Sequence, residues 1–211
     1  MRLPDRYREL ILSDLDPGEM YLQLVREVQA DRIALDYGLT ETIIYACEVR
    51  YALDVIRTGP PPQWSNFADP QGNFENLLWP LLDPLQPVRL AFAGSGPYPI
   101  TAALVAGRYP SAQITCIDNN IVAHLLSQAM LERAGVLARA LFLDAFEVDY
   151  QPFNAVIVAA MVTGKRKLVE KILDSSQALV IVRSHIALEH PRVISLPSPF
   201  DEDGILNGTL P

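Results

Sequence analysis

The sequence has few cysteines, no long hydrophobic run and a shortage of positive charge. Cys47 and Cys116 lie in apolar surroundings without the spacing of a metal site or a disulfide framework, so we expect a reducing, cytoplasmic location. No run approaches the ~18 apolar residues of a membrane span, and Asp5 comes before any apolar segment, unlike in a secretory signal. The net charge of −8 argues against nucleic-acid and anionic-membrane partners.

Hydrophobic residues are plentiful and the acids are unevenly spread. Half of the 211 residues are hydrophobic, which is ample for a packed core. Residues 1–87 carry 7 basic and 14 acidic side chains, whereas residues 88–211 carry 10 and 11. The simplest interpretation of the excess is an acidic solvated surface. We predict a helical, substrate-covering region at 1–87, followed by a nucleotide-fold domain at 88–211.

The hydrophobic pattern predicts helices first and then an α/β fold. Helices are expected over 16–37, 40–57 and 74–82, with a proline-rich loop at 58–73. From Val88 onward, short apolar runs alternate with helical stretches, as in a mostly parallel, Rossmann-like sheet that is covered on both faces. The expected strands are 88–93, 113–117, 140–143, 154–159, 179–183 and 193–196, and the helices between them are 100–108, 121–134 and 165–174.

Two glutamates interrupt an apolar face of the helix expected over 40–57. On a helical wheel, Glu41 and Glu48 fall beside Ile44 and Val55. Burying an ionised carboxylate costs several kcal/mol unless cations or donors meet it. The pattern leaves two interpretations open, namely a solvated or salt-bridged pair and a pocket for a positively charged ligand.

Three strand ends carry features of a nucleotide site. The first strand runs into the turn Gly94-Ser95-Gly96-Pro97-Tyr98-Pro99, where glycine lets the backbone take positive φ and approach a ligand closely. The second strand ends at Asp118, followed by Asn119, and an acid there can accept hydrogen bonds from both ribose hydroxyls. The third strand ends at Asp144-Ala145, where a carboxylate beside a small residue can meet an adenine edge.

The turn favours an adenosine ligand without a pyrophosphate. A dinucleotide fold uses G-x-G-x-x-G, whose third glycine permits close helix packing and whose helix N-terminus holds the pyrophosphate. Here Pro99 stands in place of that glycine, and together with Pro97 it removes amide donors. S-adenosylmethionine, with its cationic sulfonium and ammonium groups, fits better as the substrate. No group of residues has metal-ligand spacing.

Three stretches resemble nicotianamine synthases. Residues 89–99, with F-A-G-S-G-P-Y-P, look like the family's V-A-F-x-G-S-G-P-L-P. Residues 154–162 resemble Y-D-V-V-F-L-A-A-L-V, and residues 179–185 are similar to L-V-V-R-S-A-H. The resemblance covers about residues 88–190 in consistent order, whereas the N-terminal region is similar only in placement.

The resemblance implies a class I methyltransferase-like fold that breaks the bond between sulfur and the aminocarboxypropyl chain and releases methylthioadenosine. Relatives include opine-metallophore aminobutanoyltransferases and azetidine-2-carboxylate synthases. Arg183 and His185 carry over to the family's R-S-x-H position, which adds His185 to the candidate catalytic residues. The residues that the resemblance places around the ligand are Gly94, Ser95, Gly96, Asp118, Asn119, Asp144, Ala145, Ala159, Ala160 and Met161.

The sequence departs from the family after Ser184. Only one further strand is expected before Pro211, so we expect a sheet trimmed at its C-terminal end, with less material to enclose a second amino acid. This favours intramolecular cyclisation, in which the α-amine attacks its own γ-carbon to form azetidine-2-carboxylate. Transfer to an amino acid or to another S-adenosylmethionine, ordinary methylation and non-catalytic adenosine binding are the alternatives. The oligomeric state stays open.

Ring closure needs a neutral amine and a stabilised sulfonium. Glu48 or Glu41 is a candidate base for the ammonium proton. Aromatic faces can stabilise the sulfonium by cation–π contact, and the candidates are Tyr45, Tyr51, Trp79 and Tyr98. The basic run Lys165-Arg166-Lys167 is interpreted as a solvated helix face.

Overall fold

The computed structural model describes residues 9–10, 13, 15, 19–20, 23, 26, 37–62, 64, 73–184, 186 and 188–196. At its centre is a sheet in the order β3-β2-β1-β4-β5-β6, in which every neighbouring pair is parallel. Phe92 on the central strand lies opposite Cys116 on one neighbour and Ile157 on the other. The strands are β1 (Arg89–Ala93), β2 (Gln113–Asp118), β3 (Ala138–Phe142), β4 (Ala155–Val158), β5 (Leu179–Val182) and β6 (Val193–Ser195).

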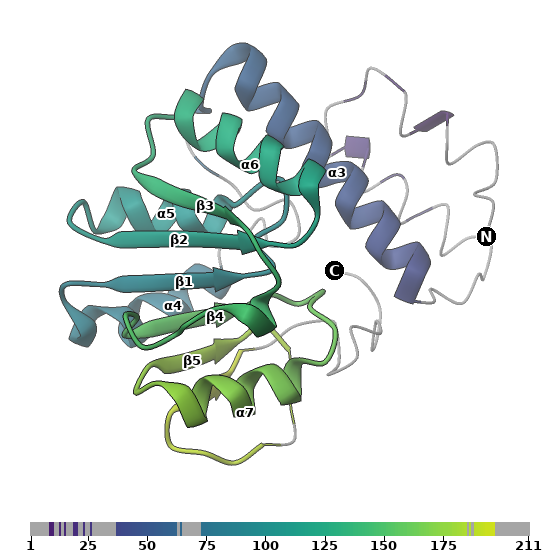
Figure 1. Cartoon of the computed structure of the whole chain (residues 1–211). Coiled ribbons are helices and arrows are strands. Elements are labelled where there is room, and N and C mark those ends of the chain that lie inside the picture. The colour runs from purple at the N-terminus through teal and green to yellow at the C-terminus, as the bar shows by residue number, and fades with distance from the viewer. Residues whose placement is uncertain are drawn as a thin grey trace.

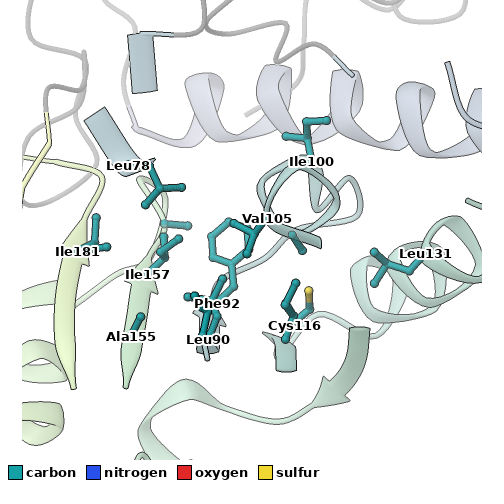
Figure 2. Packing of buried hydrophobic residues seen from close by; sticks show 14 of the residues in the cluster. Leu78, Leu90, Phe92, Ile100, Val105, Cys116, Leu131, Ala155, Ile157 and Ile181 are labelled. Atoms are coloured by element: carbon teal, nitrogen blue, oxygen red, sulfur yellow. The ribbon is translucent and has the colours of Figure 1, made fainter. Parts of the chain in front are cut away.

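Alternate residues of the same strands bury the two faces of the sheet. Leu90 and Phe92 belong to one hydrophobic cluster, and Ala91 and Ala93 belong to the other. Figure 2 shows the first cluster, where Leu90 and Phe92 lie among apolar side chains of neighbouring strands and helices. That cluster includes residues of α4 (Asn73–Leu82), α5 (Ile100–Arg108) and α6 (Ile121–Arg133), whereas the second includes residues of α7 (Lys165–Ser175). Helices therefore cover both faces, as the continuous apolar strands require.

A long helix lies where the strands end. Helix α3 (Tyr37–Thr58) packs against α6, beside the edge of the sheet toward which the strands point (Figure 1). Two short 3₁₀ turns, η1 (Asp83–Leu85) and η2 (Ala145–Glu147), follow α4 and β3. No helix in the described part of the chain is both long and apolar enough to cross a membrane.

The predicted fold class is confirmed. The six strands and five of the helices expected from the sequence are present, with bounds that agree within three residues at each end. Cys47 and Cys116 are both buried and free. Most of the helix predicted over 16–37, and the tail beyond Leu196, lie outside the described residues.

The interpretation of the basic run at the start of α7 is wrong for its first residue. Arg166 and Lys167 are exposed, but Lys165 is fully buried. Successive residues of a helix point about 100° apart, so three in a row do not share one face. Lys165 instead lies on the same side as Leu168 and Ile172, which are also fully buried.

Candidate active site

A cavity of about 350 Å³ opens at the ends of the strands, where α3 crosses them. We call its two walls the strand-end side, formed by residues at and after the ends of β1 to β5, and the α3 side, formed by Ile44, Tyr45 and Glu48. The strand-end side includes all ten residues predicted around the nucleotide: Gly94, Ser95, Gly96, Asp118, Asn119, Asp144, Ala145, Ala159, Ala160 and Met161.

The turn after β1 needs glycine at two positions. Gly94 and Gly96 have φ of 71° and 67°, a region that other residues rarely adopt. A Cβ on Gly94 would collide with the side chain of Val162, which follows β4. A Cβ on Gly96 would lie 2.5 Å from Oε2 of Glu48. The turn therefore passes closely between β4 and α3, and this brings a backbone without side chains to the cavity.

Backbone groups hold the carboxylate at the end of β2. Asp118 Oδ2 accepts a hydrogen bond from Gly96 N at 2.9 Å, and its Oδ1 accepts one from Asn120 N at 2.9 Å. The Asn120 side chain in turn caps α6 by accepting from Val122 N and Ala123 N. Each carboxylate oxygen keeps a further lone pair for a donor from a ligand.

The carboxylate after β3 is fixed in a similar way. Asp144 Oδ1 accepts a hydrogen bond from Phe146 N at 2.8 Å, and this caps the 3₁₀ turn η2. Asn119 Nδ2 lies 3.4 Å from Asp144 Oδ2, which links the ends of β2 and β3. Two strand ends thus present oriented polar groups to one side of the cavity.

Glu48 differs from the strand-end acids. Its side chain is half-buried against Gly96, and within the described residues its carboxyl has no hydrogen-bond partner. Burial raises the pKa of Glu48 from 4.5 to about 8, the positive charge of Arg183 opposes that rise, and the negative charge of Asp118 adds to it. A carboxyl with this pKa exchanges its proton near neutral pH, as a general base must.

Tyr45 stands beside Glu48 on the α3 side. Its hydroxyl donates a hydrogen bond to Asn120 Oδ1 at 3.3 Å, so α3 is tied to the start of α6. Burial raises the pKa of Tyr45, and the charges of Asp118 and Glu48 raise it further. The phenol therefore stays neutral at physiological pH. Its side chain lines the cavity.

The other aromatic candidates divide between the cavity and the core. Tyr98 lines the cavity, but Tyr51 stacks on it with ring centroids 5.1 Å apart, and Trp64 packs nearby. Trp79 does not line the cavity: it packs edge-on against Tyr109. Of the four candidates, Tyr45 is the one on the α3 side of the cavity.

Two candidate catalytic side chains lie outside the described part of the structure. Residue 41 belongs to α3, but its side chain is among those not described, and His185 is also not described. Arg183, two residues before His185, follows β5 and lines the cavity. No group of three or more side chains suited to a metal ion occurs among the residues described.

Several lining residues were not predicted from the sequence. They share positions next to predicted ones, at the ends of strands or in the first turn of a helix, and include Phe92, Thr101, Asn120, Phe146, Val162 and Thr163. Phe146 follows the predicted Asp144-Ala145 pair directly, and Thr101 follows the glycine turn. Adjacency to those motifs is the signal that could have found them.

The comparisons with known proteins agree with this geometry. A sequence model of the family described as "Nicotianamine synthase protein" matches residues 53–189, which is more than half of the chain and runs from α3 past β5. Glu48 and Tyr45 precede the matched stretch, whereas Asp118, Asp144 and Arg183 lie within it. No curated protein matches the chain significantly in sequence.

Solved structures of MtNAS share the fold. A Glu-to-Gln mutant of MtNAS is 19% identical with a TM-score of 0.55, and the match covers 89% of this chain and 87% of that one. The same mutant in complex with S-adenosylmethionine is 17% identical with a TM-score of 0.52, over 95% and 94% of the two chains. The family match and the shared fold support S-adenosylmethionine as the substrate. The chain belongs to the nicotianamine synthase family and is an S-adenosylmethionine-dependent enzyme with a methyltransferase-like fold.

Proposed function

We propose that this protein cleaves the bond between sulfur and the aminocarboxypropyl chain of S-adenosylmethionine, and that it does so by cyclisation. The α-amine attacks the γ-carbon, so that a carbon–nitrogen bond forms while the carbon–sulfur bond breaks. The electron pair of the broken bond leaves with sulfur, which gives neutral methylthioadenosine. The carbon chain closes into azetidine-2-carboxylate, and one proton of the ammonium group passes to a base.

The strand-end side supports the binding of adenosine. We assign Asp118 to the ribose hydroxyls, because its carboxylate is held by two backbone donors and retains lone pairs that face the cavity. We assign Asp144, Ala145 and Asn119 to the adenine, since they follow the two adjacent strand ends. The turn after β1 and the residues after β4 then flank the sulfonium and its chain; these residues are Gly94, Ser95, Gly96, Ala159, Ala160 and Met161.

The observation that carries the proposal is the carboxyl of Glu48, half-buried above Gly96 with its pKa raised to about 8. The α-amino groups of peptides have pKa values of about 7.7–8.0. A base and an amine of matched pKa exchange a proton at little cost. When the cationic substrate enters, its charges lower the pKa of Glu48 and favour the ionised, proton-accepting form. Tyr45, on the same side, is our candidate for a cation–π contact with the sulfonium.

The size of the cavity favours one substrate molecule. Ligand pockets range over about 300–1,000 Å³, and this cavity of about 350 Å³ lies near the lower end. A folded aminocarboxypropyl chain held in near-attack geometry needs no second amino acid. The second candidate function is intermolecular transfer of the same chain to an amino acid or to another S-adenosylmethionine. The match to a family named for nicotianamine synthesis favours that alternative.

Product analysis with S-adenosylmethionine as the only substrate tests the proposal. We expect methylthioadenosine and azetidine-2-carboxylate in equal amounts. Azetidine-2-carboxylate is the diagnostic product, because the substrate's own carboxylate can also displace methylthioadenosine without an enzyme; a reaction without protein measures that background. With a mixture of substrate ¹⁵N-labelled at the α-amine and unlabelled substrate, the product derived from the aminocarboxypropyl chain should contain a single nitrogen, either labelled or unlabelled.

The other reactions leave different products, and each would overturn cyclisation. Methylthioadenosine that forms above background only when an amino acid is added would establish transfer. So would a product of the aminocarboxypropyl chain that contains two or more amine nitrogens. S-adenosylhomocysteine formed with an acceptor would establish methylation. Binding without turnover would leave a non-catalytic adenosine binder.

A further inference from the structure

Arg183 is the one basic side chain among the described residues that line the cavity. It follows β5 directly, and its backbone N donates a hydrogen bond to Val158 O of β4 at 3.0 Å. This bond fixes the Arg183 backbone to the centre of the sheet. The side chain is half-buried and close enough to Glu48 for its charge to oppose the rise in the pKa of that carboxyl. Arg183 therefore reaches the part of the cavity beneath α3.

The charges around the cavity complement those of one substrate molecule. S-adenosylmethionine carries two cations, the sulfonium and the ammonium, and one anion, the α-carboxylate. Asp118 and Asp144 are bound to backbone donors at the ends of β2 and β3, where we place the nucleoside. Glu48, with its carboxyl group, and Arg183, with its positive charge, are the charged lining residues left for the aminocarboxypropyl end of the substrate.

Arg183 adds a positive charge to a cavity whose other charged lining residues, among those described, are acids, and a guanidinium there favours an anionic group of the ligand. The α-amine and the α-carboxylate of an amino acid are attached to the same carbon, so one group near Glu48 places the other within a few ångströms. A guanidinium can bind a carboxylate through two parallel hydrogen bonds, and such a fork fixes orientation as well as position.

We propose that Arg183 binds the α-carboxylate of the aminocarboxypropyl chain and thereby selects substrates that carry this carboxylate. This inference rests on the proposed function, because it takes S-adenosylmethionine as the substrate. Anchoring the carboxylate directs the neighbouring amine toward Glu48 and sets the bend of the chain. Arg183 is thus a specificity-determining residue that contacts the part of the substrate next to the reacting nitrogen.

Decarboxylated S-adenosylmethionine is the probe, because it keeps both cations and lacks only the carboxylate. Isothermal titration calorimetry measures the dissociation constants of both ligands for the wild type, Arg183→Gln and Arg183→Lys. We expect the wild type to prefer the carboxylated ligand by about 10–100-fold. Arg183→Gln should lose this preference by weakening only the carboxylated ligand, and Arg183→Lys should keep part of it because it retains the charge without the fork.

A surface arginine provides the matched control. Arg166 is exposed on α7 and pairs with Glu170 at 3.3 Å, away from the residues that line the cavity, so Arg166→Gln should leave both dissociation constants unchanged. Equal affinity of the wild type for the two ligands would overturn the inference without any variant. Equal weakening of both ligands in Arg183→Gln would also overturn it, since that is the result of a merely structural or long-range electrostatic role.

This test is separate from the test of the proposed function. S-adenosylhomocysteine and its decarboxylated form differ by the same carboxylate and have no sulfonium to be cleaved, so calorimetry with this pair reads the carboxylate preference whether or not the enzyme turns over. Absence of azetidine-2-carboxylate would therefore defeat the cyclisation and leave the carboxylate site standing, whereas loss of the preference would defeat the site alone.

Discussion

The strand-end side and the α3 side of the cavity both present carboxylates, but the chain surrounds those carboxylates differently. On the strand-end side, Asp118 and Asp144 each accept a hydrogen bond from the backbone N–H two residues further along the chain, and Asp118 accepts another from Gly96 in the turn after β1. On the α3 side, Glu48 has no such donor within the described residues, and burial raises its pKa to about 8. The first arrangement fixes a charge in place, and the second makes a charge easy to neutralise.

This difference separates two tasks within one cavity. Preorganised acceptors bind hydroxyl and amine donors without rearrangement, which suits the recognition of a nucleoside. A poorly solvated carboxyl changes its protonation state when a cation arrives, which suits proton transfer. If the tasks are separate, substitutions on one side of the cavity should impair binding and substitutions on the other side should impair turnover.

The largest effect is expected from Glu48→Gln, which removes the proposed base and keeps the shape of the side chain. Loss of a general base lowers rates by about 10²–10⁴-fold, and we expect kcat for methylthioadenosine formation to fall by that factor. Binding of S-adenosylmethionine, measured by calorimetry, should change much less, because the strand-end side is intact. Asp54→Asn is the control, since Asp54 is an exposed acid on the same helix. Unchanged kcat in Glu48→Gln would remove Glu48 from the mechanism.

Asp118→Asn should impair the other side of the cavity. An amide cannot accept at both positions, so its NH₂ group must face either Gly96 N or Asn120 N, and a ribose contact is weakened as well. Hydrogen bonds to charged groups contribute about 1.5–3 kcal/mol, so we expect KM to rise by about 10–100-fold while kcat falls less. Steady-state kinetics separates the two parameters.

Asp149→Asn is the matched control for this substitution. Asp149 Oδ1 accepts a hydrogen bond from the backbone N of Gln151, as Asp118 Oδ1 accepts from Asn120, but Asp149 does not line the cavity. Its kinetics should equal those of the wild type. A fall in kcat alone for Asp118→Asn would contradict the assignment of Asp118 to substrate binding.

The strand-end side was largely predictable from the sequence because its signals are local. A strand that ends in an acid or in a glycine turn puts that residue at the edge of a parallel sheet, whatever the rest of the chain does. Asp118, Asp144 and the turn after β1 all lie there. The amphipathic pattern of α3 also marked Glu48 as unusual, because a carboxylate on an apolar helix face costs free energy to bury unless cations or hydrogen-bond donors meet it.

What the sequence did not contain was the approach of one element to another. The close contact between Glu48 and Gly96 depends on how α3 crosses the sheet, and no periodicity specifies that crossing. Arg183 faces the same space because β5 lies two strands away from β1 in the sheet order, a consequence of topology. Tyr51 and Tyr98, two equal candidates in the sequence, instead form a stacked pair that closes part of the cavity wall.

Gly96→Ala should damage the contact between the two sides. Its φ of 67° already disfavours alanine, and the new Cβ would lie 2.5 Å from Oε2 of Glu48. Gly135→Ala separates these causes, because Gly135 has the same φ and nothing within 4 Å of the added Cβ. We expect Gly135→Ala to cost about 1–2 kcal/mol, and Gly96→Ala to cost more and to lower turnover as Glu48 is displaced. Equal losses of unfolding free energy for the two variants would show that Glu48 does not press on Gly96.

The smallest expected effect is a pH-dependent difference in thermal stability between the wild type and Glu48→Gln. The pKa of Glu48 rises from 4.5 to about 8 on folding, so the native state holds this proton more tightly than the unfolded chain does. Its contribution to stability is therefore lost as the pH rises from about 4.5 to about 8, and below that window there is no penalty. Glutamine does not titrate, so the comparison isolates the proton of Glu48 together with the effects of Asp118 and Arg183 on it, which occur in the wild type alone.

Thermal melts of the two proteins between pH 5 and 9 measure this difference. We expect the Tm of Glu48→Gln to approach that of the wild type near pH 5 and to exceed it by several degrees above pH 8. Saturating S-adenosylmethionine should reduce the gap at high pH, because a cation beside Glu48 favours the ionised carboxylate that burial disfavours. A gap that stays constant across this pH range would mean that Glu48 is solvated like Asp54, an exposed acid of the same helix, and the contrast between the two sides of the cavity would then disappear.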